Sequence, residues 1–136
     1  MDDRLDLTSL ESAVQRLREG LARYEKTVAD TQIRDGLIQR FEFTYELSHK
    51  MLKRYLESVS PSPEEVDRMA FADLVRSGNE QGLLVGDWAS WKNYRAMRAK
   101  TSHVYNEGVA LEVVAGIPAF LREAEYLLEQ LQSRNS

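Results

Sequence analysis

The chain has 136 residues, a formal net charge of −4 and no cysteine. This length suits one domain around a single core, and the lack of cysteine excludes disulfides, thiolate metal sites and a cysteine nucleophile. We therefore expect one helical domain over residues 1–136. The N-terminus is acidic where a signal peptide would be basic and then apolar, and no apolar run is long enough to cross a bilayer. The composition thus predicts a cytoplasmic protein without a membrane partner.

Apolar residues recur every three or four positions along most of the chain, which predicts an all-α protein. A first helix is expected to start at a capping box formed by Thr8 and Glu11, and its apolar stripe reaches Val28. A second helix is predicted from about Thr31 to Ser58. The prolines of SVSPSPEE (residues 58–65) then interrupt the helical pattern.

Three further helices are expected after the prolines. A short one starts at Pro63 and passes through Leu74 towards Gly78. Asp87 is predicted to cap the next, over residues 88–105, with an interruption near Asn106 and Gly108. The last carries the apolar residues of 111–131, with a kink at Pro118. These elements predict an antiparallel up-and-down four-helix bundle with an extra short helix between its second and third long helices.

The segment from Trp88 to Asn106 holds no acidic residue, although the chain has 22 of them. It contains four basic residues interleaved with four aromatic ones: Lys92, Arg95, Arg98 and Lys100, with Trp88, Trp91, Tyr94 and Tyr105. This mixture suits phosphate neutralisation and base stacking. The alternative is a basic helix that pairs with acidic neighbours of the same chain. At helical spacing, Trp88 and Trp91 are expected to pack in the core or in a dimer interface rather than to stack on bases.

One group of residues in this segment could carry chemistry: Arg98, His103 and Tyr105, in the spacing Arg-x4-His-x-Tyr. An imidazole can accept or donate a proton near neutral pH, and an arginine can hold a phosphate and stabilise the charge that develops on it. Together they could cleave RNA without a metal. On an ideal helix five residues turn through about 140°, so a bend near His103 or a second subunit is needed to bring the two side chains together.

The second histidine and the rest of the chain offer no competing site. His49 has no arginine four to six positions before it, and we expect it on a helix face towards a groove or solvent. The sequence contains no metal-ligand spacing, no glycine-rich phosphate loop and no GxSxG elbow. We therefore expect neither a metal nor a cofactor.

Two blocks of the sequence, RDGLIQRFEFTYELSHKMLKRYLE (residues 34–57) and GLLVGDWASWKNYRAMRAKTSHVYNE (residues 82–107), resemble the nucleotidyltransferase substrate-binding protein family of the HEPN superfamily. The resemblance covers most of the chain. It implies a HEPN-like helical bundle that forms a homodimer, with the Arg-x4-His motifs of two protomers near one cleft. Such proteins are typically encoded beside a minimal nucleotidyltransferase, and many of these pairs are toxin–antitoxin systems.

By this resemblance, Arg98 and His103 would be the catalytic residues of a ribonuclease toxin that cleaves RNA, with tRNA as one expected substrate. Tyr105 would be the hydroxyl that receives AMP from the nucleotidyltransferase, which silences the enzyme. Candidate RNA- or nucleotide-binding residues around them are Lys92, Arg95, Lys100, Ser102 and Asn106.

The chain departs from the family motif at one position, because Ala99 stands where an asparagine often follows the arginine. The alternative function is a non-catalytic subunit that presents a substrate to the nucleotidyltransferase.

Overall fold

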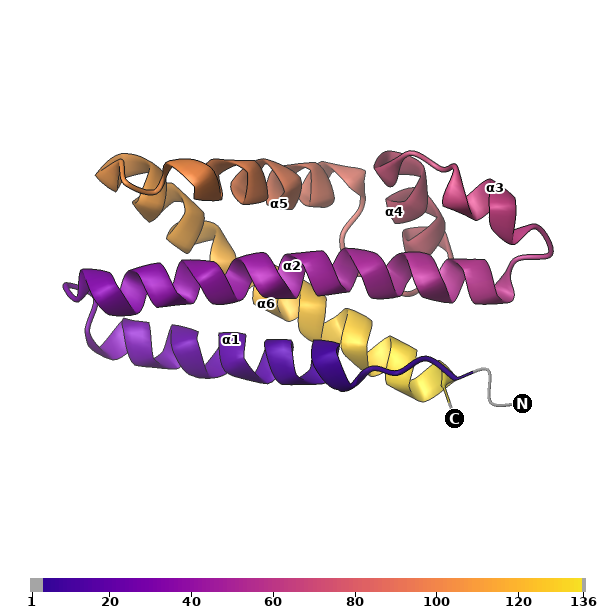
Figure 1. The fold of residues 1–136 in the computed structure, drawn as a ribbon, viewed down its shortest axis with the longest axis horizontal. Helices are drawn as coiled ribbons and strands as arrows, with labels where there is room; N and C mark the ends of the chain where they lie inside the picture. Colours follow the sequence, from indigo (N-terminus) through magenta and orange to yellow (C-terminus); the bar gives the residue numbers. More distant parts are fainter. Residues whose placement is uncertain (1–3, 136) are drawn as a thin grey trace.

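The computed structural model describes residues 4–135, which form six α-helices and one 3-10 turn. The four long helices are α1 (Thr8–Lys26), α2 (Thr31–Val59), α5 (Trp88–Lys100) and α6 (Glu107–Arg134), and successive ones run in opposite directions (Figure 1). The predicted all-α, up-and-down fold is confirmed. Residues 1–3 and 136 of the predicted domain lie outside the described part of the chain.

Helix α2 is the central element of the bundle. It runs between α1 and α5, with α6 crossing behind it (Figure 1). Its start is capped by Asp30, whose Oδ1 accepts hydrogen bonds from the backbone N–H groups of Gln32 and Ile33. Buried aromatic rings from three helices meet at the middle of the core: Phe41, Trp91, Tyr94 and Phe120, with ring centroids 5.0–6.0 Å apart around Phe120. Helix α2 contacts all the other helices, so its side chains can reach both ends of the molecule.

The first helix starts differently from the prediction. Leu7, not Thr8, is the N-cap residue, and its carbonyl accepts a hydrogen bond from the Glu11 N–H at 2.9 Å. The Thr8 N–H donates instead to Oδ1 of Asp6 at 3.0 Å. The predicted capping box is therefore wrong. Burial of Leu7 against the core sets where the helix begins, and a side chain two residues earlier satisfies the first free donor.

The predicted third helix is in fact two helices, α3 (Pro63–Asp67) and α4 (Phe71–Glu80). Both pack against α2. The break between them lets Val66 pack into the core while the Phe71 ring reaches His49 and Trp91, at centroid distances of 4.2 and 6.1 Å. One continuous helix was predicted because local spacing does not report which neighbours each side chain must reach.

The last helix is continuous from Glu107 to Arg134, with Pro118 inside it. Over residues 4–135, no helix is long and apolar enough to cross a membrane. The GLLVG segment at residues 82–86 contains no strand and links α4 to α5.

Candidate functional site at the turn between α5 and α6

Helix α5 orients the predicted site through its buried face. Asp87 caps the helix as predicted, accepting a hydrogen bond from the Ser90 N–H at 3.3 Å. Trp91, Tyr94 and Met97 are buried, so the basic side chains between them point to solvent. Trp91 is fully buried, which confirms the core placement expected for it. Trp88 is half-buried with its ring 5.9 Å from that of Phe71.

The chain then turns sharply between the two helices. Helix α5 ends at Lys100, a 3-10 turn follows over Thr101–His103, and Asn106 caps α6 by accepting from the Val109 N–H at 3.2 Å. The predicted interruption near Asn106 is confirmed, but helix α5 ends at Lys100, five residues before the end predicted at Tyr105. We call residues 101–106, which hold the His103 and Tyr105 end of the predicted catalytic motif, the catalytic-motif turn.

This turn brings together two of the three motif residues. On a continuous helix His103 and Tyr105 would point about 200° apart. Here His103 Nδ1 lies 3.4 Å from Tyr105 Oη, with the two rings edge to face. Both side chains are exposed, and Tyr105 retains 85% of its accessible surface. The imidazole and the phenol therefore form one exposed polar pair.

Arg98 is held in place one turn before this pair. Its Nε–H donates to Oε1 of Glu46 on α2 at 2.9 Å, and Nη1 donates to Oγ1 of Thr101 at 2.9 Å. Oε2 of Glu42, one helical turn before Glu46, lies 3.9 Å from Nη1. The Thr101 hydroxyl in turn donates to the Arg98 carbonyl at 2.7 Å, which closes a small ring of contacts.

These contacts leave part of the guanidinium available to a ligand. A guanidinium has five N–H donors, and within residues 4–135 two of them donate hydrogen bonds. The side chain is 32% exposed, so the remaining donors can reach an incoming phosphate. Among residues 4–135, no hydrogen bond or ion pair joins Arg98 to His103. The structure thus brings His103 together with Tyr105, whereas Arg98 lies on the preceding helix, five residues before His103, and contacts Glu46 and Thr101 instead.

The other predicted binding residues divide into two groups. Lys92 and Arg95 are exposed and form no ion pair within the described part of the chain. Lys100 is exposed but pairs with Glu112 at 3.1 Å, and the Asn106 side chain serves as the helix cap. Ser102 is exposed on the turn. Pairing with acidic neighbours therefore occurs for Arg98 and Lys100, whereas Lys92 and Arg95 keep their charges available.

His49 lies on α2 in a separate groove. This groove has a volume of about 450 Å³ and is lined by Glu46, Leu47, His49, Lys50 and Lys53. The imidazole packs on the Phe71 ring, and burial lowers its pKa. The expectation of a helix-face residue at a groove is confirmed. A larger hollow of about 670 Å³ between α1 and α2 contains none of the predicted site residues.

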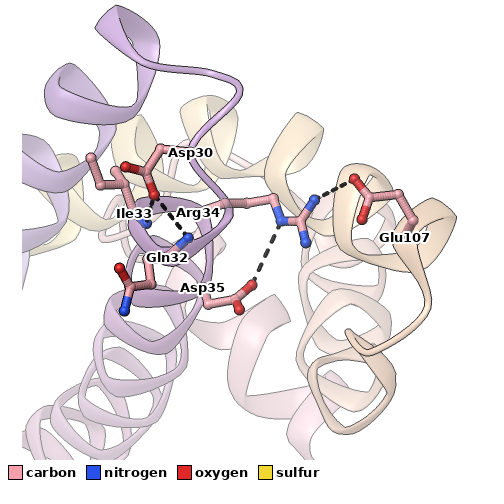
Figure 2. Close-up of polar contacts among 6 residues, drawn as sticks. All are labelled: Asp30, Gln32, Ile33, Arg34, Asp35 and Glu107. Carbon is pink, nitrogen blue, oxygen red and sulfur yellow. Dashed lines mark hydrogen bonds and ion pairs between the residues drawn. The ribbon is translucent and has the colours of Figure 1, made fainter.

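Sequence reasoning missed the partners that hold the site. Glu42 and Glu46 stand four residues apart on one face of α2, a spacing that could have suggested a shared partner. A second pair links Arg34 of α2 to Glu107 at the start of α6, with Nη1 2.6 Å from Oε1 (Figure 2). These two residues are 73 positions apart, and nothing in the local pattern connects them. Among residues 4–135, no group of three or more His, Cys, Asp or Glu side chains is placed to hold a metal ion.

Comparison with known proteins agrees with this architecture. The chain is 39% identical over 144 aligned positions to Probable ribonuclease HepT of Haemophilus influenzae, covering 99% of this chain and 97% of that protein. A solved Haemophilus influenzae structure, reported to reveal the fold of a substrate binding domain of a nucleotidyltransferase, is similar with a TM-score of 0.87 and 35% identity. That match covers 93% of this chain and 99% of the other.

A crystal structure from Thermus thermophilus is also similar, with a TM-score of 0.73 and 29% identity over 90% of this chain and 98% of that one. The family model described as nucleotidyltransferase substrate binding protein like matches residues 5–133. The chain therefore belongs to the nucleotidyltransferase substrate-binding protein family.

Proposed function

We propose that this protein is a metal-independent HEPN ribonuclease in which Arg98 and His103 act on RNA and Tyr105 controls activity. The observation that carries the proposal is the exposed His103–Tyr105 pair, which follows an arginine with unused donors at the end of the preceding helix. The 39% identity to Probable ribonuclease HepT over nearly the whole chain supports the same function.

The chemistry needs only side chains of these types. The ribose 2′-hydroxyl attacks the adjacent phosphorus, the bond to the 5′-oxygen breaks, and a 2′,3′-cyclic phosphate and a 5′-hydroxyl are formed. His103 accepts the proton of the 2′-hydroxyl or donates one to the leaving oxygen. The free N–H groups of Arg98 stabilise the charge on the pentavalent phosphorus. Lys92 and Arg95, further along the exposed side of α5, neutralise neighbouring phosphates.

Control would act at the tyrosine. In AMP transfer, Tyr105 Oη attacks the α-phosphorus of ATP, pyrophosphate leaves and the phenolic proton is released. The product would place a negatively charged, bulky group within contact distance of His103. The transferring enzyme would be a partner nucleotidyltransferase, consistent with the family to which the chain belongs. We also propose that the chain is a single domain and acts in the cytoplasm as a homodimer. The Arg-x4-His motifs of the two protomers would then lie near one cleft.

Cleavage of RNA by the purified protein tests the catalytic assignment. We expect His103→Ala and Arg98→Ala each to lower the cleavage rate by about 10²–10⁴-fold, because proton transfer or charge stabilisation is lost. His49→Ala is the matched control and should keep full activity. Product ends should carry 2′,3′-cyclic phosphate, and chelators should not slow the reaction. Equal activity of wild type and both motif variants would show that the site lies elsewhere.

A second candidate function is a non-catalytic partner subunit. Two observations favour it: the similar solved structure is described as a substrate binding domain of a nucleotidyltransferase, and Ala99 replaces the asparagine frequent in the motif. This candidate predicts a stable complex with the nucleotidyltransferase but no RNA cleavage by wild type. Intact mass and fragmentation of the chain co-expressed with that partner would then show no AMP on Tyr105.

A further inference from the structure

Arg34 is a charged residue in an unexpected place. Its side chain is only 7% exposed, yet it sits in the first turn of α2 and no sequence pattern singled it out. Burial of a guanidinium is unfavourable unless hydrogen bonds compensate for the lost water. A buried arginine is therefore expected to have a specific partner. The position of that partner in the chain identifies the segment that the arginine holds in place.

That partner is Glu107, the first residue of α6. Arg34 Nη1 donates to Glu107 Oε1 at 2.6 Å, and Oδ1 of Asp35 lies 3.6 Å from Nε (Figure 2). The hydrogen bond to Glu107 is the main cause that raises the pKa of Arg34. Glu107 follows directly after the catalytic-motif turn, so the ion pair ties the end of this turn to α2.

The arginine end of the pair has a well-defined position. Asp30 caps α2 through two backbone N–H groups, and its carbonyl accepts from the Arg34 N–H at 3.1 Å (Figure 2). Arg34 therefore projects from a capped and ordered first turn. Glu107 in turn starts a helix whose N-terminus favours a negative side chain. Both residues of the ion pair therefore project from the first turn of a helix rather than from a loop.

Other contacts hold parts of the turn, among them the ion pair between Lys100, directly before it, and Glu112 of α6. At its beginning, Thr101 is buried and bonded to Arg98, which Glu46 of α2 holds. Within it, the Asn106 N–H donates to the His103 carbonyl at 3.0 Å, and Val104 packs partly against the core. His103 and Tyr105 contact only each other through side-chain hydrogen bonds in the described part of the chain. Two ion pairs to the same helix therefore bracket the turn, one before it and one after it.

We propose that the Arg34–Glu107 ion pair positions the catalytic-motif turn, and with it His103 and Tyr105, relative to Arg98. Arg34 and Glu107 are positioning residues that touch neither RNA nor the reacting atoms. Helix α2 acts as a common support, because it holds Arg98 through Glu46 and the far end of the turn through Arg34. The catalytic part of this inference rests on the proposed ribonuclease function.

Hydrogen exchange of the whole protein tests the positioning role without any need for activity. In Glu107→Ala we expect the amides of His103–Asn106 to exchange at least about tenfold faster, since their anchor is lost, while the α6 amides of Leu127–Leu131 keep their wild-type rates. Arg34→Met, which keeps volume but not charge, should give the same pattern. Glu107→Gln keeps an acceptor oxygen and should restore most of the protection.

The matched control breaks a different ion pair of helix α6. Glu125→Gln removes the contact of α6 with Arg18 of α1, away from the turn, and should leave the exchange of the turn unchanged. If the turn and the α6 core exchange faster together in Glu107→Ala, the pair only stabilises the fold and the proposal is overturned. Unchanged exchange at the turn overturns it as well.

RNA cleavage then separates this inference from the proposed function. In Glu107→Ala and Arg34→Met we expect kcat to fall at least about tenfold while KM for RNA changes less than about twofold, because Lys92, Arg95 and Arg98 still bind phosphates from α5. A rise in KM at constant kcat would overturn the positioning role. If wild type cleaves no RNA, the proposed function fails, and hydrogen exchange alone still decides whether the pair positions the turn.

Discussion

Two polar clusters, one near the start of α5 and one just after its end, differ in how completely their groups are satisfied. In the first, the buried carboxylate of Glu123 accepts hydrogen bonds from the Val85 N–H, the Gly86 N–H and the Trp91 indole at 2.7–2.8 Å. In the second, His103 and Tyr105 are exposed and share one contact of 3.4 Å. The carboxylate of the first cluster is buried beneath its three donors and out of reach of a ligand, whereas the side chains of the second cluster are exposed and accessible.

The difference shows how a charged side chain in this protein can be assigned to structure or to function. A buried carboxylate with three donors stabilises the link between α4 and α5 and fixes the start of the helix that carries Arg98. Exposed groups with unused hydrogen-bonding capacity contribute little to folding and stay accessible to water or to a ligand. The contrast predicts that changes to the first cluster lower stability and that changes to the second do not.

The largest expected effect concerns Glu123. Replacement by alanine leaves two backbone donors and the Trp91 indole without partners in the core, so Glu123→Ala should lower the free energy of unfolding by about 3–5 kcal/mol. His103→Ala, at an exposed position, should change it by less than about 0.5 kcal/mol. Urea unfolding of both variants provides the comparison. Similar losses in the two variants would remove the distinction between the clusters.

Two glycine substitutions test how tightly the Glu123 cluster is packed: one lies at the cluster and the other at an uncrowded position on α2. A Cβ on Gly86 would lie 2.8 Å from Cβ of Ser90 and 2.9 Å from Oε1 of Glu123, so Gly86→Ala should cost about 1–3 kcal/mol of stability. A Cβ on Gly36 of α2 would meet no atom within 4 Å, and Gly36→Ala should gain about 0.5–1 kcal/mol. Thermal or urea unfolding would measure both. A neutral Gly86→Ala would mean that the Glu123 cluster tolerates rearrangement.

The smallest expected effect is a pH dependence from His49, the half-buried counterpart of exposed His103. Burial lowers the pKa of His49 below its ordinary value of 6.5, while Glu46 raises it and Lys53 and Arg95 lower it. The unfolded chain therefore binds more protons than the folded chain just below pH 6.5. The stability linked to this residue is full above pH 6.5 and is lost as the pH falls.

The variant His49→Gln should lack this contribution. We expect the difference in unfolding free energy between wild type and variant to be constant above about pH 7.5 and to shift against wild type as the pH falls below about 6.5. Urea titrations at each pH would measure it. A difference that does not change with pH would show that the imidazole accepts its charge in the folded protein without cost.

Much of the fold could be predicted because its causes are local. The three- and four-residue spacing of apolar side chains specified the long helices, and the structure confirms the helix start predicted at Asp87 and the interruption predicted near Asn106. The capping box at Thr8 and the single third helix were wrong for the opposite reason. Burial of Leu7 and the contacts of Val66 and Phe71 decided those boundaries, and each depends on neighbours distant in sequence.

The candidate site shows the same division. Arg98, His103 and Tyr105 are visible as a motif, since all three lie within one short segment of the chain. The groups that hold them are not visible in this way: Glu46 is 52 positions from Arg98, and Arg34 is 73 positions from Glu107. Hydrogen bonds across such separations depend on how the helices pack, and no local pattern encodes them.

The sequence by itself determined that this protein is all-α, which residues form its motif and to which family it belongs, because periodicity, capping and motif spacing act within a few helical turns. Only the tertiary structure decided that α5 ends at Lys100, that His103 turns back to Tyr105, and that α2 anchors both sides of this turn. The physical reason is that buried charges such as Arg34 and Glu123 need partners, and the packing of distant helices determines which partners they find.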